Sequence, residues 1–147
     1  MADFSQVTSR LFTGAAISGA ADVTALINAG VTAVIDLRAE QDDTPFLAGS
    51  GMAYLWNPAA DDGQSKPADW FGRSLSFALP LLAQPRQKVN CHCAAGVNRG
   101  PSTAYMIMRA LGWTAAEAEA VIRAARPQVG LAYKGDADAA VTALGYA

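Results

Sequence analysis

The chain has 147 residues, of which 52% are hydrophobic and 16% are charged, a composition that excludes a disordered chain and predicts one globular domain over residues 1–147. Its formal net charge is −2 and its eleven Lys and Arg residues are scattered, so we expect no nucleic acid and no membrane surface as a partner. The longest apolar stretch, residues 74–83, is too short to span a bilayer and no secretion signal precedes it, so we expect a cytoplasmic location.

The first half of the chain alternates short strands with a helix. Residues 11–13 predict a short strand, and residues 22–29 predict a helix that ends at Gly30. The β-branched, mostly apolar run 31–37 is typical of a central strand. Residues 53–56 predict a further strand, which we expect to end at the following Asn-Pro step.

The alternation continues in the second half. Residues 57–67 predict a loop, because they are rich in Asp, Gly, Ser and Pro, and a helix over 68–83 is expected to be kinked or interrupted near Pro80. Residues 88–92 predict a strand that leads into a loop and then a helix, which begins near Pro101 and ends at Leu111.

Two more helices complete the chain, and together the elements indicate an α/β fold. Thr114 and Glu117 have the spacing of a capping box, which opens a helix through Ala125. A last helix is expected over 136–144. Strands that alternate with longer helices predict a central, mostly parallel sheet flanked by helices.

Both cysteines and the single histidine of the chain are consecutive, as Cys91, His92 and Cys93. A structural zinc site needs four ligands, so three adjacent ones argue against a metal. A papain-type pair or a Ser-His-Asp triad needs a histidine that folds back on the nucleophile, whereas neighbouring side chains of an extended segment point to opposite faces. Most other cysteine chemistry is thereby disfavoured, and we expect no cofactor.

The order strand, Cys93 loop, helix suits the transfer of a phosphoryl group. Arg99 lies six residues after Cys93, and its planar guanidinium can hold two phosphate oxygens at once. We expect the backbone N–H groups of the intervening loop to supply the other donors, and Gly96 to permit the loop's backbone angles. This phosphate-binding loop consists of Ala94, Ala95, Gly96, Val97, Asn98 and Arg99. The positive end of the following helix and Arg99 should keep Cys93 a thiolate at neutral pH.

A leaving oxygen must also be protonated, usually by a carboxylic acid on a loop. The loop after Trp56 offers Asp61 and Asp62, and we favour Asp61.

These residues resemble a known family. His92-Cys93-x5-Arg99 with Gly96 is similar to the signature of the protein tyrosine phosphatase superfamily, in particular its compact dual-specificity branch. The resemblance covers nearly the whole chain and implies a single-domain phosphatase fold. It further implies that Cys93 forms a phosphocysteine intermediate, that Arg99 binds the phosphate and stabilises the transition state, and that His92 braces the loop through hydrogen bonds and favours the thiolate. Asp61 would be the general acid, because a Pro precedes it by three residues as in the family's acid loop.

The chain departs from the family at Gly100, where a Ser or Thr usually helps the thiolate to leave. Ser102 could replace that hydroxyl, or the second step is slow, in which case Gly100→Ser should speed it.

The loop also lacks the lysines of phosphoinositide-specific members, so a phosphorylated protein or a small phosphomonoester is the expected partner. Phosphotyrosine is the leading substrate, with phosphoserine and phosphothreonine next. Two alternatives stay open, namely a pseudophosphatase that binds phosphate with little turnover, and a related thiol enzyme such as a sulfurtransferase or arsenate reductase.

Overall fold

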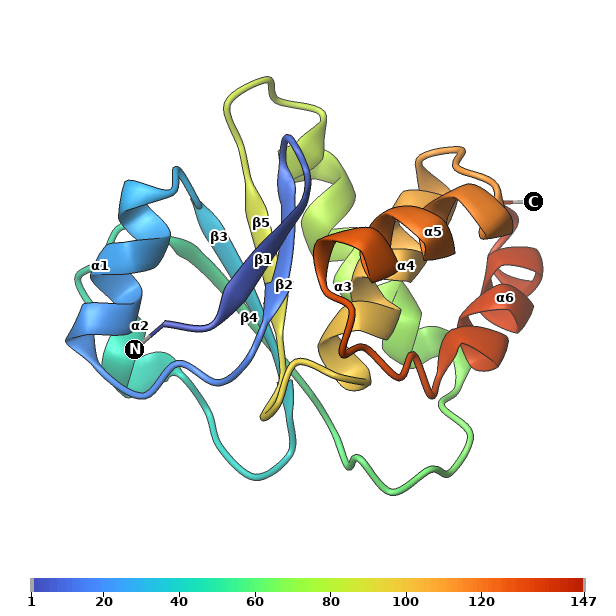
Figure 1. Cartoon of the computed structure of the whole chain (residues 1–147), viewed down its shortest axis with the longest axis horizontal. Coiled ribbons are helices and arrows are strands. Elements are labelled where there is room, and N and C mark those ends of the chain that lie inside the picture. The colour runs from blue at the N-terminus through green and yellow to red at the C-terminus, as the bar shows by residue number, and fades with distance from the viewer. Residues whose placement is uncertain (1, 147) are drawn as a thin grey trace.

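A computed structural model describes residues 2–146 and has a central five-stranded sheet in the order β1-β2-β5-β3-β4 (Figure 1). The strands are β1 (Phe4–Thr8), β2 (Leu11–Gly14), β3 (Ala33–Arg38), β4 (Ala53–Ala59) and β5 (Val89–His92). β1 pairs with β2 in antiparallel fashion, and the other three strand pairs are parallel. The predicted α/β fold with a mostly parallel sheet is therefore confirmed.

Helices cover both faces of this sheet. α1 (Ala20–Asn28) and α2 (Thr44–Leu47) lie on one side in Figure 1. The four remaining helices, α3 (Ala68–Leu82), α4 (Arg99–Ala110), α5 (Ala115–Ala125) and α6 (Lys134–Ala143), form a layer on the other side. No helix in the described range 2–146 combines the length and apolarity that crossing a membrane requires.

Burial on two faces explains the composition of the central strands. All six residues of β3 are buried, as a strand covered by helices on both faces requires. A large hydrophobic cluster lies between the sheet and α3–α6, and it includes Phe71, Tyr105 and Ile122. A smaller cluster, built around Phe12 and Leu26, lies under α1 and α2.

Two sequence predictions about the strands and helices need correction. β4 continues through Asn57 and Pro58, because a register irregularity between β3 and β4 removes the ladder bond that proline could not make, and because the Asn57 amide is buried against Trp70. α3 runs through Pro80 to Leu82 without interruption. Pro80 lies in its last turn, where only one backbone hydrogen bond is lost. β1 and α2 were not predicted from the sequence at all.

Candidate active site

Cys93 lies directly after β5, where the chain turns toward the N-terminus of α4. Its side chain is buried, with 2% of the residue exposed. The backbone N–H of Gly100, in the first turn of α4, donates to the Cys93 sulfur over 3.2 Å. A donor from a helix N-terminus stabilises negative charge on that sulfur. The predicted sequence of strand, cysteine loop and helix is therefore present, with the sulfur beneath the helix end.

The loop between Cys93 and Arg99 is held from outside by its carbonyl groups. The carbonyls from Ala94 to Val97 accept hydrogen bonds from elsewhere in the chain: the donors are Ala16 N, the Arg126 guanidinium for two carbonyls, and Gly130 N together with Leu131 N. The Asn98 carbonyl accepts from Ser102 N in the first turn of α4. Within residues 2–146, the backbone N–H groups of residues 94–99 have no such partner. A loop whose carbonyls are bound outward leaves its N–H groups available as a nest for an anion.

Arg126 is central to this arrangement. Its side chain is 1% exposed, and it donates to the carbonyls of Gly96 (2.8 Å) and Ala95 (3.0 Å) while it pairs with Asp3 (2.8 Å). Gly96 has φ +68°, and a Cβ there would lie 2.5 Å from the Arg126 guanidinium and 2.6 Å from the Gly14 backbone. Only glycine fits this position, as the sequence predicted, and the crowding is a second reason besides the backbone angle.

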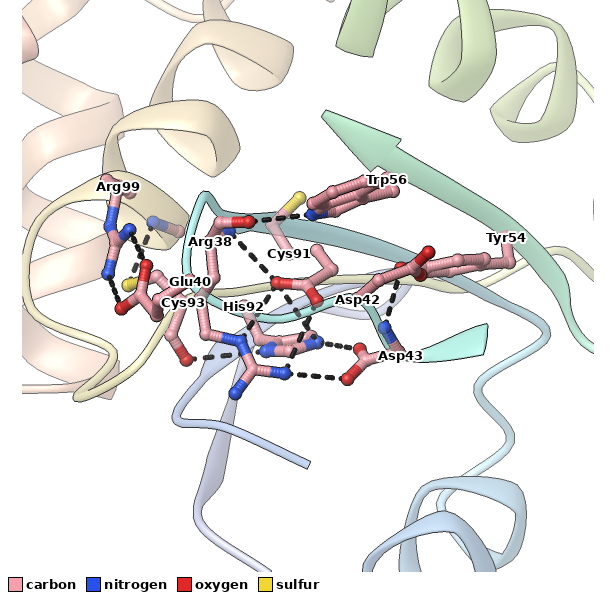
Figure 2. Close-up of polar contacts among 12 residues, drawn as sticks. Arg38, Glu40, Asp42, Asp43, Tyr54, Trp56, Cys91, His92, Cys93 and Arg99 are labelled. Atoms are coloured by element: carbon pink, nitrogen blue, oxygen red, sulfur yellow. Dashed lines mark hydrogen bonds and ion pairs between the residues drawn. The ribbon is translucent and has the colours of Figure 1, made fainter. Parts of the chain in front are cut away.

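The guanidinium of Arg99 lies beside Cys93 and is held by a carboxylate that the sequence did not indicate. Arg99 Nη1 and Nη2 donate to the two oxygens of Glu40 over 2.7 and 2.9 Å (Figure 2). Nη1 also donates to the Ala59 carbonyl, whereas the buried Nε has no partner within the described chain. The hydrogen bonds from Arg99 lower the pKa of Glu40 to about 2. Arg99 is thus fixed in place and keeps one N–H edge free for an anion.

The two candidate acids occupy different surroundings. Asp61 Oδ1 accepts from the hydroxyl of Tyr133 over 2.7 Å, and its two oxygens lie 3.4–3.5 Å from the Asn98 amide on the cysteine loop. Asp62 instead pairs with Lys66 over 2.8 Å, and this hydrogen bond lowers the pKa of the Asp62 carboxyl. The structure therefore brings Asp61, and not Asp62, next to the cysteine loop.

His92 lies in a buried cluster, and its Nδ1 lies 3.3 Å from the carbonyl oxygen of Cys93. Its Nε2 contacts Asp43, and Asp36 lies 3.9 Å away. These three are the one group within residues 2–146 that could hold a metal ion. However, the Arg38 guanidinium already donates to both carboxylates, over 3.1 Å to Asp36 and 2.7 Å to Asp43. A metal ion bound there would be repelled by this positive charge. Arg38 is the last residue of β3 and is 5% exposed, so it is no surface charge.

The hydroxyl that was expected after Arg99 has no substitute in the first turn of α4. Ser102 is buried, and its Oγ accepts from the backbone N–H of Tyr133 over 3.3 Å. The group of the first turn of α4 that donates a hydrogen bond to the Cys93 sulfur is the backbone N–H of Gly100.

The comparisons with known proteins identify the family and the fold of the chain. The family profile described as "Dual specificity phosphatase, catalytic domain" matches residues 11–134, and the chain belongs to this family. It is a protein phosphatase family, and the resemblance inferred from the sequence is confirmed.

Solved structures of low sequence identity share the fold. The human tyrosine phosphatase-like serine/threonine/tyrosine-interacting protein is 18% identical, with 100% of both chains covered and a TM-score of 0.80. PTPMT1 in complex with PI(5)P is 17% identical over 96% of this chain and 98% of that chain, with a TM-score of 0.78. A mouse putative dual specificity phosphatase complexed with zinc tungstate is 19% identical over 99% and 92%, with a TM-score of 0.77.

Proposed function

We propose that the chain is an active phosphatase that hydrolyses phosphomonoesters through a phosphocysteine intermediate on Cys93. The observation that supports this most directly is the nest above the sulfur, in which the loop carbonyls are bonded outward and the N–H groups of residues 94–99 remain free. A phosphoryl group in transfer carries its charge on three equatorial oxygens, which such a ring of donors would stabilise together with the Arg99 guanidinium.

In the first step the Cys93 thiolate attacks phosphorus, and the bond between phosphorus and the ester oxygen breaks. The departing oxygen takes a proton from Asp61, which becomes a carboxylate. In the second step that carboxylate takes a proton from water, the water oxygen attacks phosphorus, and the S–P bond breaks. The products are inorganic phosphate and the regenerated thiolate, so both protons are accounted for.

We assign the acid role to Asp61 rather than Asp62. Its contact with Asn98 lies on the rim of the phosphate loop, whereas Asp62 is engaged by Lys66. The lowered pKa of Asp62 also keeps this group ionised, which suits an acid poorly.

Substrates with a single phosphate fit the site best, with phosphotyrosine first and phosphoserine or phosphothreonine second. The interior of the loop is neutral, at Ala94, Ala95, Val97 and Asn98, and Arg38 is turned into the protein. A headgroup with several phosphates would need further cations around the nest. The similarity of the fold to PTPMT1, which was crystallised with PI(5)P, makes that lipid the informative comparison substrate.

Hydrolysis of an aryl phosphate, with inhibition by vanadate, tests the proposal. Cys93→Ser should reduce turnover to below about one thousandth of the wild-type rate and still bind phosphate. Cys91→Ser is a matched variant of a buried cysteine on β5 outside the nest, and it should keep turnover. No hydrolysis by the folded wild-type protein would refute the proposal.

The acid is assigned by Asp61→Ala and Asp62→Ala, each measured on leaving groups of low and high pKa. Loss of the true acid slows poor leaving groups most. We expect this selective loss in Asp61→Ala alone, and the same selectivity in Asp62→Ala would reverse the assignment.

Gly100 favours one alternative, a phosphate-binding module with little turnover, because the hydroxyl that aids thiolate departure is missing there. Tungstate or phosphate binding without hydrolysis would support that function instead.

A further inference from the structure

Three ion pairs around the cysteine loop share one arrangement, a buried cation with a half-exposed carboxylate. The pairs are Arg99 with Glu40 (2.7 Å), Lys66 with Asp62 (2.8 Å) and Arg126 with Asp3 (2.8 Å). The three cationic side chains are only 1–8% exposed, whereas the three carboxylate side chains are 48–56% exposed. In the ion pairs made by the outer helices, the cationic side chain is itself 16–55% exposed.

Each of the three pairs is anchored to the proposed active site. Glu40 binds the guanidinium of Arg99, and Asp62 directly follows the proposed acid in the chain (Figure 2). Asp3 binds Arg126, which donates to two carbonyls of the cysteine loop. We call the three carboxylates of Asp3, Glu40 and Asp62 the acidic rim.

The acidic rim is charged at neutral pH. The hydrogen bond from the paired cation lowers the pKa of the carboxyl group in Asp3, Glu40 and Asp62. Because the cation of each pair is buried and its carboxylate reaches solvent, a molecule that approaches from outside meets the negative end of the pair first. Charges of one sign around a binding site attract ligands of the opposite sign and repel those of the same sign.

No exposed cation offsets this charge near the nest. The segments 38–43, 59–66, 93–99 and 126–133 contain no Lys or Arg side chain that is more than 8% exposed. Other cations lie at the opposite edge of the sheet (Figure 1), where Arg10 precedes β2 and Lys88 precedes β5, whereas Cys93 follows β5. Since β2, β5, β3 and β4 are parallel, the edge that carries the nest is the acidic one.

The centre of the site nevertheless suits an anion. Arg99 is 2% exposed, and its buried Nε has no hydrogen-bond partner within residues 2–146. The free N–H groups of residues 94–99 lie in the same loop. The site therefore combines donors for one phosphate with negative charge around them. A ligand that matches both parts carries one phosphate with positive charge beside it.

We propose that the substrate is a protein segment in which Lys or Arg residues flank the phosphorylated side chain, and that the acidic rim selects it. The inference deepens the proposed function, on which it rests for the place of the phosphate. Asp3, Glu40 and Asp62 are specificity-determining residues in this proposal. A headgroup with several phosphates brings negative charge to the acidic rim and is disfavoured.

Three peptides of equal length with one phosphotyrosine each test this preference. They carry two Lys, two Gln or two Glu residues on either side of the phosphotyrosine. In about 20 mM NaCl we expect kcat/KM to be at least about tenfold higher for the Lys peptide than for the Glu peptide, with the Gln peptide between them. In about 0.5 M NaCl the ratio should fall below about threefold, because salt screens exposed charges. Equal values at low salt, or a preference for the Glu peptide, would overturn the inference.

Asp62→Asn removes one charge of the acidic rim and leaves Lys66 without its carboxylate. The ratio between the Lys and Glu peptides should fall at least about threefold. Glu117→Gln is the matched control, because it removes an exposed carboxylate beyond the far end of α4 and retains the capping box. Its ratio should equal that of wild type. An unchanged ratio in folded Asp62→Asn, or an equal fall in both variants, overturns the inference. The wild-type comparison stands if Asp62→Asn does not fold.

Binding to Cys93→Ser separates this inference from the proposed function, because it does not require turnover. Fluorescence anisotropy with the labelled peptides should show the Lys peptide bound at least about tenfold more tightly than the Glu peptide at low salt. Equal affinities, or no binding of any peptide, overturn the inference. A folded wild-type protein that binds the peptides with this preference and hydrolyses none of them refutes the proposed function alone.

Discussion

Gly100 stands where the family resemblance predicts a Ser or Thr, and its surroundings are crowded. A Cβ at Gly100 would lie 2.9 Å from the Cys91 carbonyl oxygen, 3.2 Å from His92 Cα and 3.2 Å from the Thr13 hydroxyl. The missing hydroxyl is therefore coupled to a tight approach of α4 to the end of β5. A serine introduced there must displace backbone as well as supply a hydroxyl.

We expect Gly100→Ser and Gly100→Ala to lose about 1–3 kcal/mol of unfolding free energy each, because both add the same crowded Cβ. Only the serine should speed breakdown of the phosphocysteine intermediate. Rapid-mix kinetics would then show a pre-steady-state burst in wild type and in the alanine variant, and a smaller burst with faster turnover in the serine variant. No burst in wild type and no gain in the serine variant would contradict this prediction.

Glu40 provides a pH-dependent contribution to stability. Its hydrogen bonds from Arg99 lower its pKa from 4.5 to about 2 in the folded protein. The contribution is therefore fully present above the ordinary carboxyl pKa and is lost as pH falls toward 2. Since the Glu40 side chain is 53% exposed, solvent screening limits the contribution to under about 1 kcal/mol.

Urea unfolding of wild type and Glu40→Gln measures this contribution. The variant should be less stable at pH 6, and the difference should shrink as the pH is lowered from 4.5 toward 2. A difference that stays constant over this range would show that the charge of Glu40 is not its source.

At the scale of elements, local signals predicted all of the described helices and strands except β1 and α2. The capping box of Thr114 and Glu117 opens α5 as predicted, because both hydrogen bonds lie within one turn. β1 was missed because its residues 4–8 are mostly polar and only Val7 is buried. α2 was missed because a single turn is too short to show a helical period. β4 extends beyond its predicted end because tertiary burial of Asn57 outweighs the turn propensity of the Asn-Pro step.

The acid loop is tied to α6 by the residue that precedes that helix, Tyr133. Its hydroxyl donates to Asp61 over 2.7 Å and accepts from the Gly63 backbone N–H over 3.1 Å. A further bond joins Lys66 N to Asp136 over 3.0 Å. One buried hydroxyl thus holds both the proposed acid and the backbone of its loop.

Tyr133→Phe removes this hydroxyl and keeps the ring. We expect kcat to fall about 3- to 10-fold for alkyl phosphates, whose leaving groups need the acid, and to change little for p-nitrophenyl phosphate, whose leaving group does not. Tyr146→Phe is the matched control, because that ring is 43% exposed near the end of the chain. Equal losses on both substrates in Tyr133→Phe would indicate a structural role only.

At the scale of the whole molecule, the candidate site joins segments that are far apart in the sequence. Residue types and spacing predicted that Cys93 and Arg99 lie together, and the family resemblance predicted that Asp61 joins them; the catalytic roles of the three stay predictions. Glu40 and Arg126 could not be given their roles, because each acts through a tertiary contact, with Arg99 in one case and with the loop carbonyls in the other. Whether a charged side chain meets such a partner depends on how the layers pack, and no local pattern encodes it.

Because distant segments hold the nest in place, binding of an oxyanion should stabilise the molecule as a whole. A ligand at 100 times its Kd adds about 2.7 kcal/mol to the free energy of unfolding. For a chain of this size the corresponding rise in Tm is roughly 5–10 °C, and tungstate or vanadate is the ligand to use. Arg99→Lys keeps the charge but loses the planar fork, so its Tm should rise much less at the same concentration. Arg73→Lys on α3 should respond like wild type, since its ion-pair partner Asp69 and its hydrogen-bond partner Asn57 lie outside the cysteine loop. An equal rise in Tm for Arg99→Lys and wild type would mean that the anion binds elsewhere, and that the outward-bonded carbonyls serve only to stabilise the loop.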